Sequence, residues 1–239
     1  MLINLWRSVF KNRLRLINLT LVLCGAAFLA NGVGVASAQA RALAPQDDTQ
    51  VWNDVQVSVP LNKQVDFVLN GTLRVGRDVS HLVDRRIGAG FLFKAGKYLT
   101  FYPSFLNIVT RPVANRKGNE TRLSFAATAR LPLGKFALSD RNLFQRRLRY
   151  SQGNSTQYRN RLQIERPLEF GKMQLRIFAS DEVFYDWSVD DWVRNRFAIG
   201  GSKAFNKQLT GELYYLRQND GRSRPGDLHV IGTAMRVRL

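Results

Sequence analysis

A two-residue alternation of apolar and polar side chains runs through this chain and constrains its fold more than any other feature. In residues 65–75 most apolar side chains fall on odd positions and most polar ones on even positions, as in Leu73-Arg74-Val75. Successive side chains of a strand point to opposite faces, so such a run predicts a strand with one apolar and one polar face. The same pattern recurs in residues 122–131, 158–165, 173–182 and 231–239.

The predicted strands are long. Most contain 10 to 14 residues, against about five or six in soluble sheets and about 9–11 in strands that cross a bilayer at a tilt. Tight connections such as 95–97 alternate with longer polar ones such as 110–119, which is the layout of outer-membrane barrels. We therefore predict an all-β fold, an antiparallel transmembrane β-barrel over residues 51–239. Its strands are expected near 51–60, 64–76, 85–94, 97–109, 119–132, 141–151, 157–167, 172–185, 191–204, 208–219 and 227–239.

The number of strands is the difficulty in this prediction. An antiparallel barrel whose two chain ends both lie in the periplasm needs an even number, whereas eleven runs are found. One crossing is then missed, split or false. Residues 40–50 do not resemble a strand, and residues 131–140 could hide a short one. We expect twelve strands, with ten as the alternative.

The first forty residues predict export from the cytoplasm. A basic stretch without acids, residues 7–15, precedes an apolar run over residues 16–30, and Ala36-Ser37-Ala38 follows. This order matches a cleaved signal peptide, so we expect residues 1–38 to be removed, with Ala40 as the second choice of cleavage site. Residues 39–50 are then an N-terminal extension. An uncleaved membrane anchor and a lipoprotein at Cys24 are the alternatives, although Leu23 is bulky where a lipoprotein signal has a small residue.

Removal of residues 1–38 takes away Cys24, the only cysteine, so the mature chain cannot form an internal disulfide. The formal charge falls from +18 to +14 because four basic residues leave with the signal. An exported protein seldom meets nucleic acid, and the arginines are spread along the strands, so no nucleic-acid partner is expected. The expected location is the cell outer membrane. The expected partners are outer-membrane lipid, the barrel-assembly machinery and small anionic solutes.

The alternating arginines predict a basic interior. Arginine facing lipid at the midplane of a barrel costs about 2–4 kcal/mol, so these side chains should point into the lumen, with too few acids to balance them. The expected lumen-lining residues are Arg122, Arg130, Arg147, Arg149, Arg159, Arg161, Arg176, Arg194, Arg196 and Arg236, with Glu165, Asp181, Glu182 and Glu212 among them.

Two functions follow from a basic lumen. A water-filled lumen would be a small anion-preferring porin or channel for acidic solutes. A lumen in which arginines and acids interlock would be a plugged, non-conducting structural barrel. Because the arginines outnumber the acids, the channel is our first hypothesis.

An outer-membrane enzyme acting on lipid is the alternative from a different class. His81 could join Ser80 and Asp84, and His229 could join Ser223 and Asp227, but neither set has a motif context. We name no catalytic residue; the sequence favours a barrel without enzymatic activity but leaves the enzyme open as the alternative. Asp186, Asp190 and Asp191 could hold Ca²⁺ in a loop, although loop aspartates are more often solvated, and no metal site or cofactor is predicted. The Gly88-Ala89-Gly90 segment lies in a predicted strand, which gives little support to phosphate binding.

Several short segments occur in a specific order over nearly the whole mature chain. They are Asp48-Thr49-Gln50 with Trp52, the hairpin from Arg147 through Arg159, Arg161 and Glu165, Asp181-Glu182 with Phe184, Asn195-Arg196 with Gly200, and Gly211-Glu212-Leu213 with Tyr215, Gln218 and His229. In these segments the chain resembles the family catalogued as domain of unknown function 2490, predicted outer-membrane β-barrel proteins of Gram-negative bacteria. This family has no established activity, so the resemblance implies a barrel and a location but no mechanism.

Overall fold

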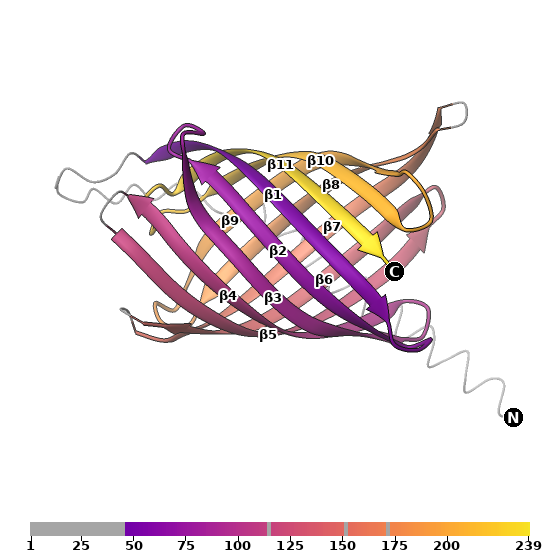
Figure 1. The fold of residues 1–239 in the computed structure, drawn as a ribbon, viewed down its shortest axis with the longest axis horizontal. Helices are drawn as coiled ribbons and strands as arrows, with labels where there is room; N and C mark the ends of the chain where they lie inside the picture. The colour runs from indigo at the N-terminus through magenta and orange to yellow at the C-terminus, as the bar shows by residue number, and fades with distance from the viewer. Residues whose placement is uncertain (1–45, 114–115, 151–152, 171–172) are drawn as a thin grey trace, which may run out of the picture. The chain divides into compact units, whose positions relative to one another are not determined.

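The computed structural model describes residues 46–113, 116–150, 153–170 and 173–239. In these ranges eleven strands form one closed barrel, in which each strand pairs with its neighbours in the chain and the first strand pairs with the last (Figure 1). The predicted signal peptide and most of the predicted extension lie outside the described residues. The strands are β1 (Asp47–Pro60), β2 (Val65–Gly76), β3 (His81–Ala95), β4 (Leu99–Val113), β5 (Arg116–Leu133), β6 (Phe136–Arg149), β7 (Ser155–Phe170), β8 (Met173–Asp186), β9 (Asp191–Ala204), β10 (Leu209–Asn219) and β11 (Asp227–Arg238).

The barrel closes through a parallel pair, β1 with β11, whereas every other pair is antiparallel. This seam runs in unbroken register from Asp47 opposite Asp227 to Ser58 opposite Arg238. Backbone hydrogen bonds extend it at both ends, from Gly226 N to Gln46 O (2.9 Å) and from Leu239 N to Ser58 O (3.0 Å). The expectation of twelve or ten strands was wrong, because a parallel seam closes a barrel with an odd number.

The two ends of the barrel differ in their connections. At the turn end, residues 61–64, 96–98, 134–135, 171–172 and 205–208 join the strands. At the loop end, residues 77–80, 114–115, 150–154, 187–190 and 220–226 join them. The even-number argument assumed that both ends of the barrel segment lie on the same side of the membrane. It failed because β1 starts at the loop end and β11 finishes at the turn end.

Six of the strands, β1 and β3–β7, are longer than the alternation predicted. β4 and β5 reach Val113 and Arg116, so most of the loop expected at 110–119 is strand. β5 runs to Leu133 and β6 begins at Phe136, which leaves no hidden strand in residues 131–140. β1 begins at Asp47 and so takes in four residues that the sequence assigned to the extension. Within the described residues no helix is long and apolar enough to cross a membrane.

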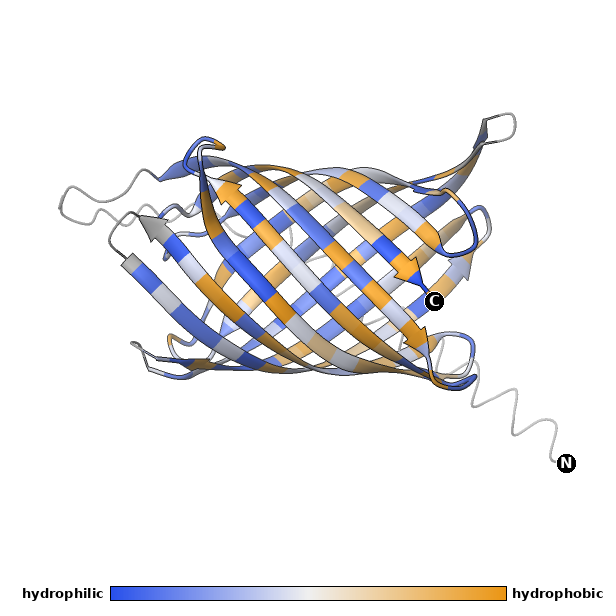
Figure 2. Ribbon diagram, viewed as in Figure 1, coloured by the Kyte–Doolittle hydropathy of each residue, from blue (hydrophilic) through white to orange (hydrophobic). Residues whose placement is uncertain are grey.

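The alternation separates two faces of the wall, as the colours along the strands show (Figure 2). On β3, Ile87, Phe91 and Phe93 are exposed on the outer face, at 69%, 44% and 41% of their surface. On β2, Asp66 and Val68 on the other face are buried, at 0% and 2%. The barrel therefore has an apolar outside and a mixed, mostly polar inside.

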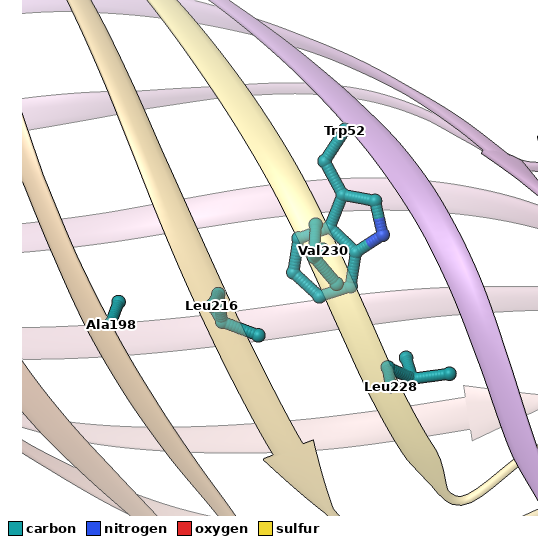
Figure 3. Packing of buried hydrophobic residues seen from close by; sticks show 5 residues of the cluster. All are labelled: Trp52, Ala198, Leu216, Leu228 and Val230. Atoms are coloured by element: carbon teal, nitrogen blue, oxygen red, sulfur yellow. The ribbon is translucent and has the colours of Figure 1, made fainter.

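An apolar cluster fills the interior beside the seam. Its five buried side chains come from β1, β9, β10 and β11 (Figure 3). The ring of Tyr214 packs against them. Gly232 on β11 leaves room for that ring, because a Cβ at this position would lie 2.0 Å from the Tyr214 Cζ atom. The cluster narrows the lumen at the seam. Its members are Trp52, Ala198, Leu216, Leu228 and Val230.

The parallel seam can be tested by a disulfide across it. Asn53 and Thr233 are register partners on the outer face, with Thr233 Oγ1 2.8 Å from Asn53 Oδ1. In a Cys24→Ser background, we expect the Asn53→Cys/Thr233→Cys pair to form a disulfide on mild oxidation, because partner Cα atoms lie within its reach. Non-reducing electrophoresis measures the product.

A pair shifted by two residues is the control for this disulfide. Val55 pairs with Met235, so Val55→Cys with Thr233→Cys places the two Cα atoms beyond the roughly 7 Å that a disulfide tolerates. Equal crosslinking of the two pairs, or none in the matched pair, would contradict the parallel seam.

Candidate functional site

Two cavities occupy the inside of the barrel. One, of about 470 Å³, extends toward the turn end and is called the turn-side cavity. The other, of about 310 Å³, lies under the β10–β11 connection and is called the loop-side cavity. Arg74 and Arg196 line both, so the cavities meet at these two side chains.

Both cavities have more bases than acids among the described residues that line them. The turn-side cavity is lined by Arg74, Arg141, Arg159, Arg161, Arg196 and Arg236, with Asp54, Glu182 and Glu212. The loop-side cavity is lined by Arg74, Arg86, Arg122, Arg147, Arg149, Arg194, Arg196 and Arg224, with Asp48, Asp84 and Glu120.

Glu182 on β8 is the centre of the charges in the turn-side cavity. Its side chain is 8% exposed, and its carboxylate lies 2.5 Å from Arg141 Nη2, 2.8 Å from Arg159 Nη2 and 4.0 Å from Arg196 Nη1. Arg161 pairs in register with Arg141 on one side and Glu182 on the other. Within the part of the chain that the structure describes, the side chain of Arg161 makes no hydrogen bond or ion pair, and its Nε atom is buried without a partner. One carboxylate therefore faces four guanidinium groups.

The loop-side cavity contains two further ion-pair groups. Glu120 accepts hydrogen bonds from Arg122 Nε and Arg147 Nε, both at 2.6 Å. Asp84 lies 2.5 Å from Arg86 Nη2 and 3.7 Å from Arg74 Nη1. Each of these carboxylates again faces two arginines, which leaves a positive excess in this cavity as well.

An aromatic belt lies where the two cavities meet. The Arg74 guanidinium stacks 3.5 Å from the Trp52 ring centroid, and Arg196 lies 5.0 Å from Trp52 and 4.9 Å from the ring of Phe184. Arg159 and Arg194 approach the same Phe184 ring at 4.5 Å and 5.3 Å. Each such contact stabilises by about 0.5–2 kcal/mol, depending on its desolvation. We call Trp52, Arg74, Phe184 and Arg196 the central belt. In this belt the two aromatic rings hold the guanidinium groups of Arg74 and Arg196 in fixed positions across the lumen.

Asp220 fastens the connection that borders the loop-side cavity. Its carboxylate accepts hydrogen bonds from Arg194 Nε (2.6 Å) and from the backbone amides of Arg222 (2.8 Å) and Ser223 (2.9 Å). Burial alone would raise the pKa of Asp220, but the Arg194 charge and these hydrogen bonds hold the pKa below its usual value. The connection is thus tied to β9 by an ionised group.

The predicted lumen residues fall into three groups in the structure. Ten line the cavities: Arg122, Arg147, Arg149, Arg159, Arg161, Arg194, Arg196, Arg236, Glu182 and Glu212. Arg130 and Glu165 contact each other and, like Arg176, line neither of the two cavities. Asp181 belongs to the outer face, because its neighbours Ser180 and Glu182 are the buried inward residues of β8.

Sequence reasoning missed Arg74, Arg86 and Arg141, and also Asp84 and Glu120. Arg74 was recognised on the polar side of its strand but was not assigned to the lumen. Arg86 follows Arg85 directly, so the sequence alone does not decide which of the two points inward; the structure buries Asp84 and leaves Arg85 exposed.

The histidines do not assemble the suggested triads. His229 Nδ1 lies 2.7 Å from the Tyr215 hydroxyl, and both side chains are exposed, whereas Ser223 lines the loop-side cavity. His81 contacts Ser80, but Asp84 pairs with arginines in the lumen. The described residues contain no group of three potential metal ligands. The guanidinium groups that line the cavities are donors of the type that binds carboxylates and phosphates.

The role of Glu182 can be tested by removing its charge. Glu182→Gln leaves Arg141, Arg159 and Arg196 without their shared carboxylate, and breaking a buried ion pair costs about 3–5 kcal/mol. We expect a loss of this size in the free energy of unfolding, measured with urea in detergent. Glu212→Gln is the control, because its partner Arg236 is 48% exposed and such pairs contribute less than about 1 kcal/mol. Similar small losses in both variants would contradict the role assigned to Glu182.

The fastening of the β10–β11 connection can be tested with trypsin, which cleaves after Arg222. Charge-assisted hydrogen bonds contribute about 1.5–3 kcal/mol, so Asp220→Asn should speed cleavage at pH 8 by about tenfold or more. Asp191→Asn removes the other carboxylate near Arg222, but that pair is half-exposed, and little change is expected.

The same contacts predict a pH dependence. The pKa of Asp220 is lower in the folded protein than its value of about 3.9 in the unfolded chain. The stabilisation that ionised Asp220 gives to the β10–β11 connection is therefore present above the unfolded pKa and is lost as the pH falls through the folded pKa. The protection of the backbone amides of residues 220–226 against hydrogen exchange, taken relative to the intrinsic exchange rate at each pH, should therefore fall under acid in the wild-type protein. Protection unchanged by acid, and equal trypsin rates in the two variants, would contradict the fastening.

Comparison with known proteins gives a family match and similarity to several solved structures. A search of curated proteins finds no match. The barrel is similar to LpxR from Salmonella typhimurium, with 9% identity and a TM-score of 0.47 over 73% of this chain and 83% of that one. It is also similar to an anion-selective porin from Comamonas acidovorans, with 14% identity and a TM-score of 0.33 over 71% of this chain and 55% of the porin. At these values neither likeness transfers an activity.

The family match covers the barrel itself. A family model described as "Protein of unknown function (DUF2490)" matches residues 49–229, which include nine complete strands (β2–β10), most of β1 and the first three residues of β11. The predicted family is thereby confirmed, and the chain belongs to the DUF2490 family.

Proposed function

We propose that the protein is an outer-membrane channel whose narrow basic lumen passes small anions. The observation that carries this proposal is the pair of adjoining interior cavities, each bordered by at least twice as many arginines as acids among the described residues. An apolar outer wall and a closed backbone ladder support insertion into a bilayer. This wall and the predicted signal peptide support the proposed location in the outer membrane.

The excess of guanidinium groups supports anion preference. A bound or passing anion next to Arg141 and Arg161 would relieve the repulsion between two like charges that lie directly opposite on β6 and β7. Rings of arginine set anion selectivity in other pores by the same electrostatic rule. The turn-side cavity is therefore the proposed anion site of the channel.

The central belt sets the proposed size limit. Trp52 and Phe184 are 3% and 2% exposed, and the stacked Arg74 and Arg196 reduce the space between the cavities further. An anion moving from one cavity to the other must pass these two guanidinium groups. Small inorganic or carboxylate anions fit this path better than sugars.

Planar-bilayer recording tests the channel. We expect the purified barrel to give discrete conductance steps, with a reversal potential in a KCl gradient that indicates chloride preference. The preference should weaken between 0.1 M and 1 M salt, because the Debye length falls from about 10 Å to about 3 Å. Arg161→Glu should shift the reversal potential toward cation preference.

Arg85→Glu is the matched control, because it makes the same charge change at an exposed side chain next to the buried Asp84. It should leave the reversal potential unchanged. A silent membrane would contradict the channel and favour the plugged barrel. A silent membrane with lipid hydrolysis that His229→Ala abolishes would favour the enzyme instead.

A further inference from the structure

The outer wall of β6–β9 carries a group of polar side chains in an otherwise apolar surface. Each lies between inward residues of its own strand: Asn160 lies between Arg159 and Arg161, which line the turn-side cavity, and therefore points to the opposite face. All of them are half-buried in the single barrel. We call this group the polar wall patch; it consists of Asp140, Asn142, Asn160, Asp181 and Asn195.

Hydrogen bonds join most of the patch into a network. Asn160 Nδ2 donates to Asp140 Oδ1 (2.6 Å) and to Asn142 Oδ1 (3.2 Å), and Asn142 Nδ2 donates to Asp140 Oδ2 (3.1 Å). Asn195 Nδ2 donates to Asp181 Oδ1 at 2.9 Å. Within the described ranges, neither carboxylate has an ion pair with a basic side chain, unlike the acids of the lumen. Acceptor positions on both carboxylates thus remain open toward the outside.

The patch has apolar neighbours on either side along the strands. On β6 the next outward side chains are Leu138 and Phe144, which bracket Asp140 and Asn142. On β8 Ala179 and Val183 bracket Asp181 in the same way. The patch is therefore not part of the polar rim at either end of the barrel. In a bilayer it would face acyl chains, which neither donate nor accept hydrogen bonds.

The patch offers both halves of a hydrogen-bonded contact. Its two aspartates are acceptors, and Asn142 and Asn195 each keep one amide N–H that the network does not use, so the same surface turned through a two-fold axis presents donors to acceptors. Lipid headgroups and soluble solutes meet a barrel at its rims, not between apolar rows. A second copy of this chain is the occupant whose chemistry matches the patch without any further component.

Aromatic side chains next to the patch would enlarge such a contact. Phe144 lies 5.1 Å from Tyr158, and Tyr185 lies 5.4 Å from Trp192, measured between ring centroids. Phe144 and Trp192 are 50% and 56% exposed. Exposed aromatic rings around hydrogen-bonding groups are typical of the centres of protein interfaces.

We propose that two copies of this chain associate in the membrane through the polar wall patch on β6–β9. The proposal rests on the membrane location proposed above but not on conduction. Each copy removes the partner's aspartates and asparagines from lipid contact. The lumen of each barrel stays separate, because the interface lies on the outer wall.

Cysteine crosslinking in membranes tests the interface. In the Cys24→Ser background, we expect Asn160→Cys to form a covalent dimer with a short bismaleimide. Leu69→Cys, an exposed outward position on β2 away from the patch, is the control and should not crosslink. Equal crosslinking at both positions, no crosslink at Asn160→Cys, or a product with a different protein would overturn the proposal.

A second variant keeps the test independent of the inserted cysteine. Replacing Asn142, Asn160 and Asp181 by leucine should convert the mass of the protein in mild detergent from two chains to one, measured by light scattering. If the patch instead faces lipid, the wild type is already a single chain and the leucine variant resists heat denaturation better, which would overturn the proposal. Conductance of the folded protein is recorded separately, so failure of the channel and failure of the dimer are distinguishable.

Discussion

Every backbone amide and carbonyl of a sheet that crosses hydrocarbon needs a partner within the protein, because lipid offers none. In this barrel the last unpaired edges are those of β1 and β11, and they meet in parallel over twelve register pairs. Parallel closure removes the requirement for an even number of strands. It also places the start of β1 at the loop end and the finish of β11 at the turn end. The position of Trp52 against the inner residues of β9–β11 depends on this seam.

The closed wall in turn decides how charges are arranged inside. Arginines on neighbouring strands point into a common space, so interior carboxylates such as Glu120 and Glu182 are shared by two or more guanidinium groups. Ion pairs in such a space hold side chains in place, and the positive charge that remains is the basis of the proposed anion path. The guanidinium group of Arg74 is restrained by stacking on Trp52 and by its ion pair with Asp84. The proposed anion path and the fixed positions of the interior side chains both result from arginines of neighbouring strands that face one lumen.

The same strands carry a second polar surface on their other face. Arg141 and Asn142 are adjacent in sequence, yet one lines the turn-side cavity and the other belongs to the polar wall patch. Asp181 and Glu182 divide in the same way. Polar residues on both faces of β6–β9 indicate that these strands meet protein or water inside and, in our proposal, a second barrel outside.

The sequence by itself determined the strands, since alternation over long runs is a local property that survives without knowledge of any partner. It also predicted the inward face of cavity-lining residues such as Arg236, which alternates clearly with its apolar neighbours Met235 and Val237. The sequence did not determine which of two adjacent polar residues points into the lumen. In the pairs Arg85-Arg86, Arg141-Asn142 and Asp181-Glu182 both residues are polar, so the alternation does not assign either one to a face. The strand number, the parallel seam, the sharing of Glu182 and the polar wall patch all depend on the register between strands that are distant in the chain. Only the tertiary structure decides that register, because a shift of one residue against a neighbour exchanges the inner and outer faces.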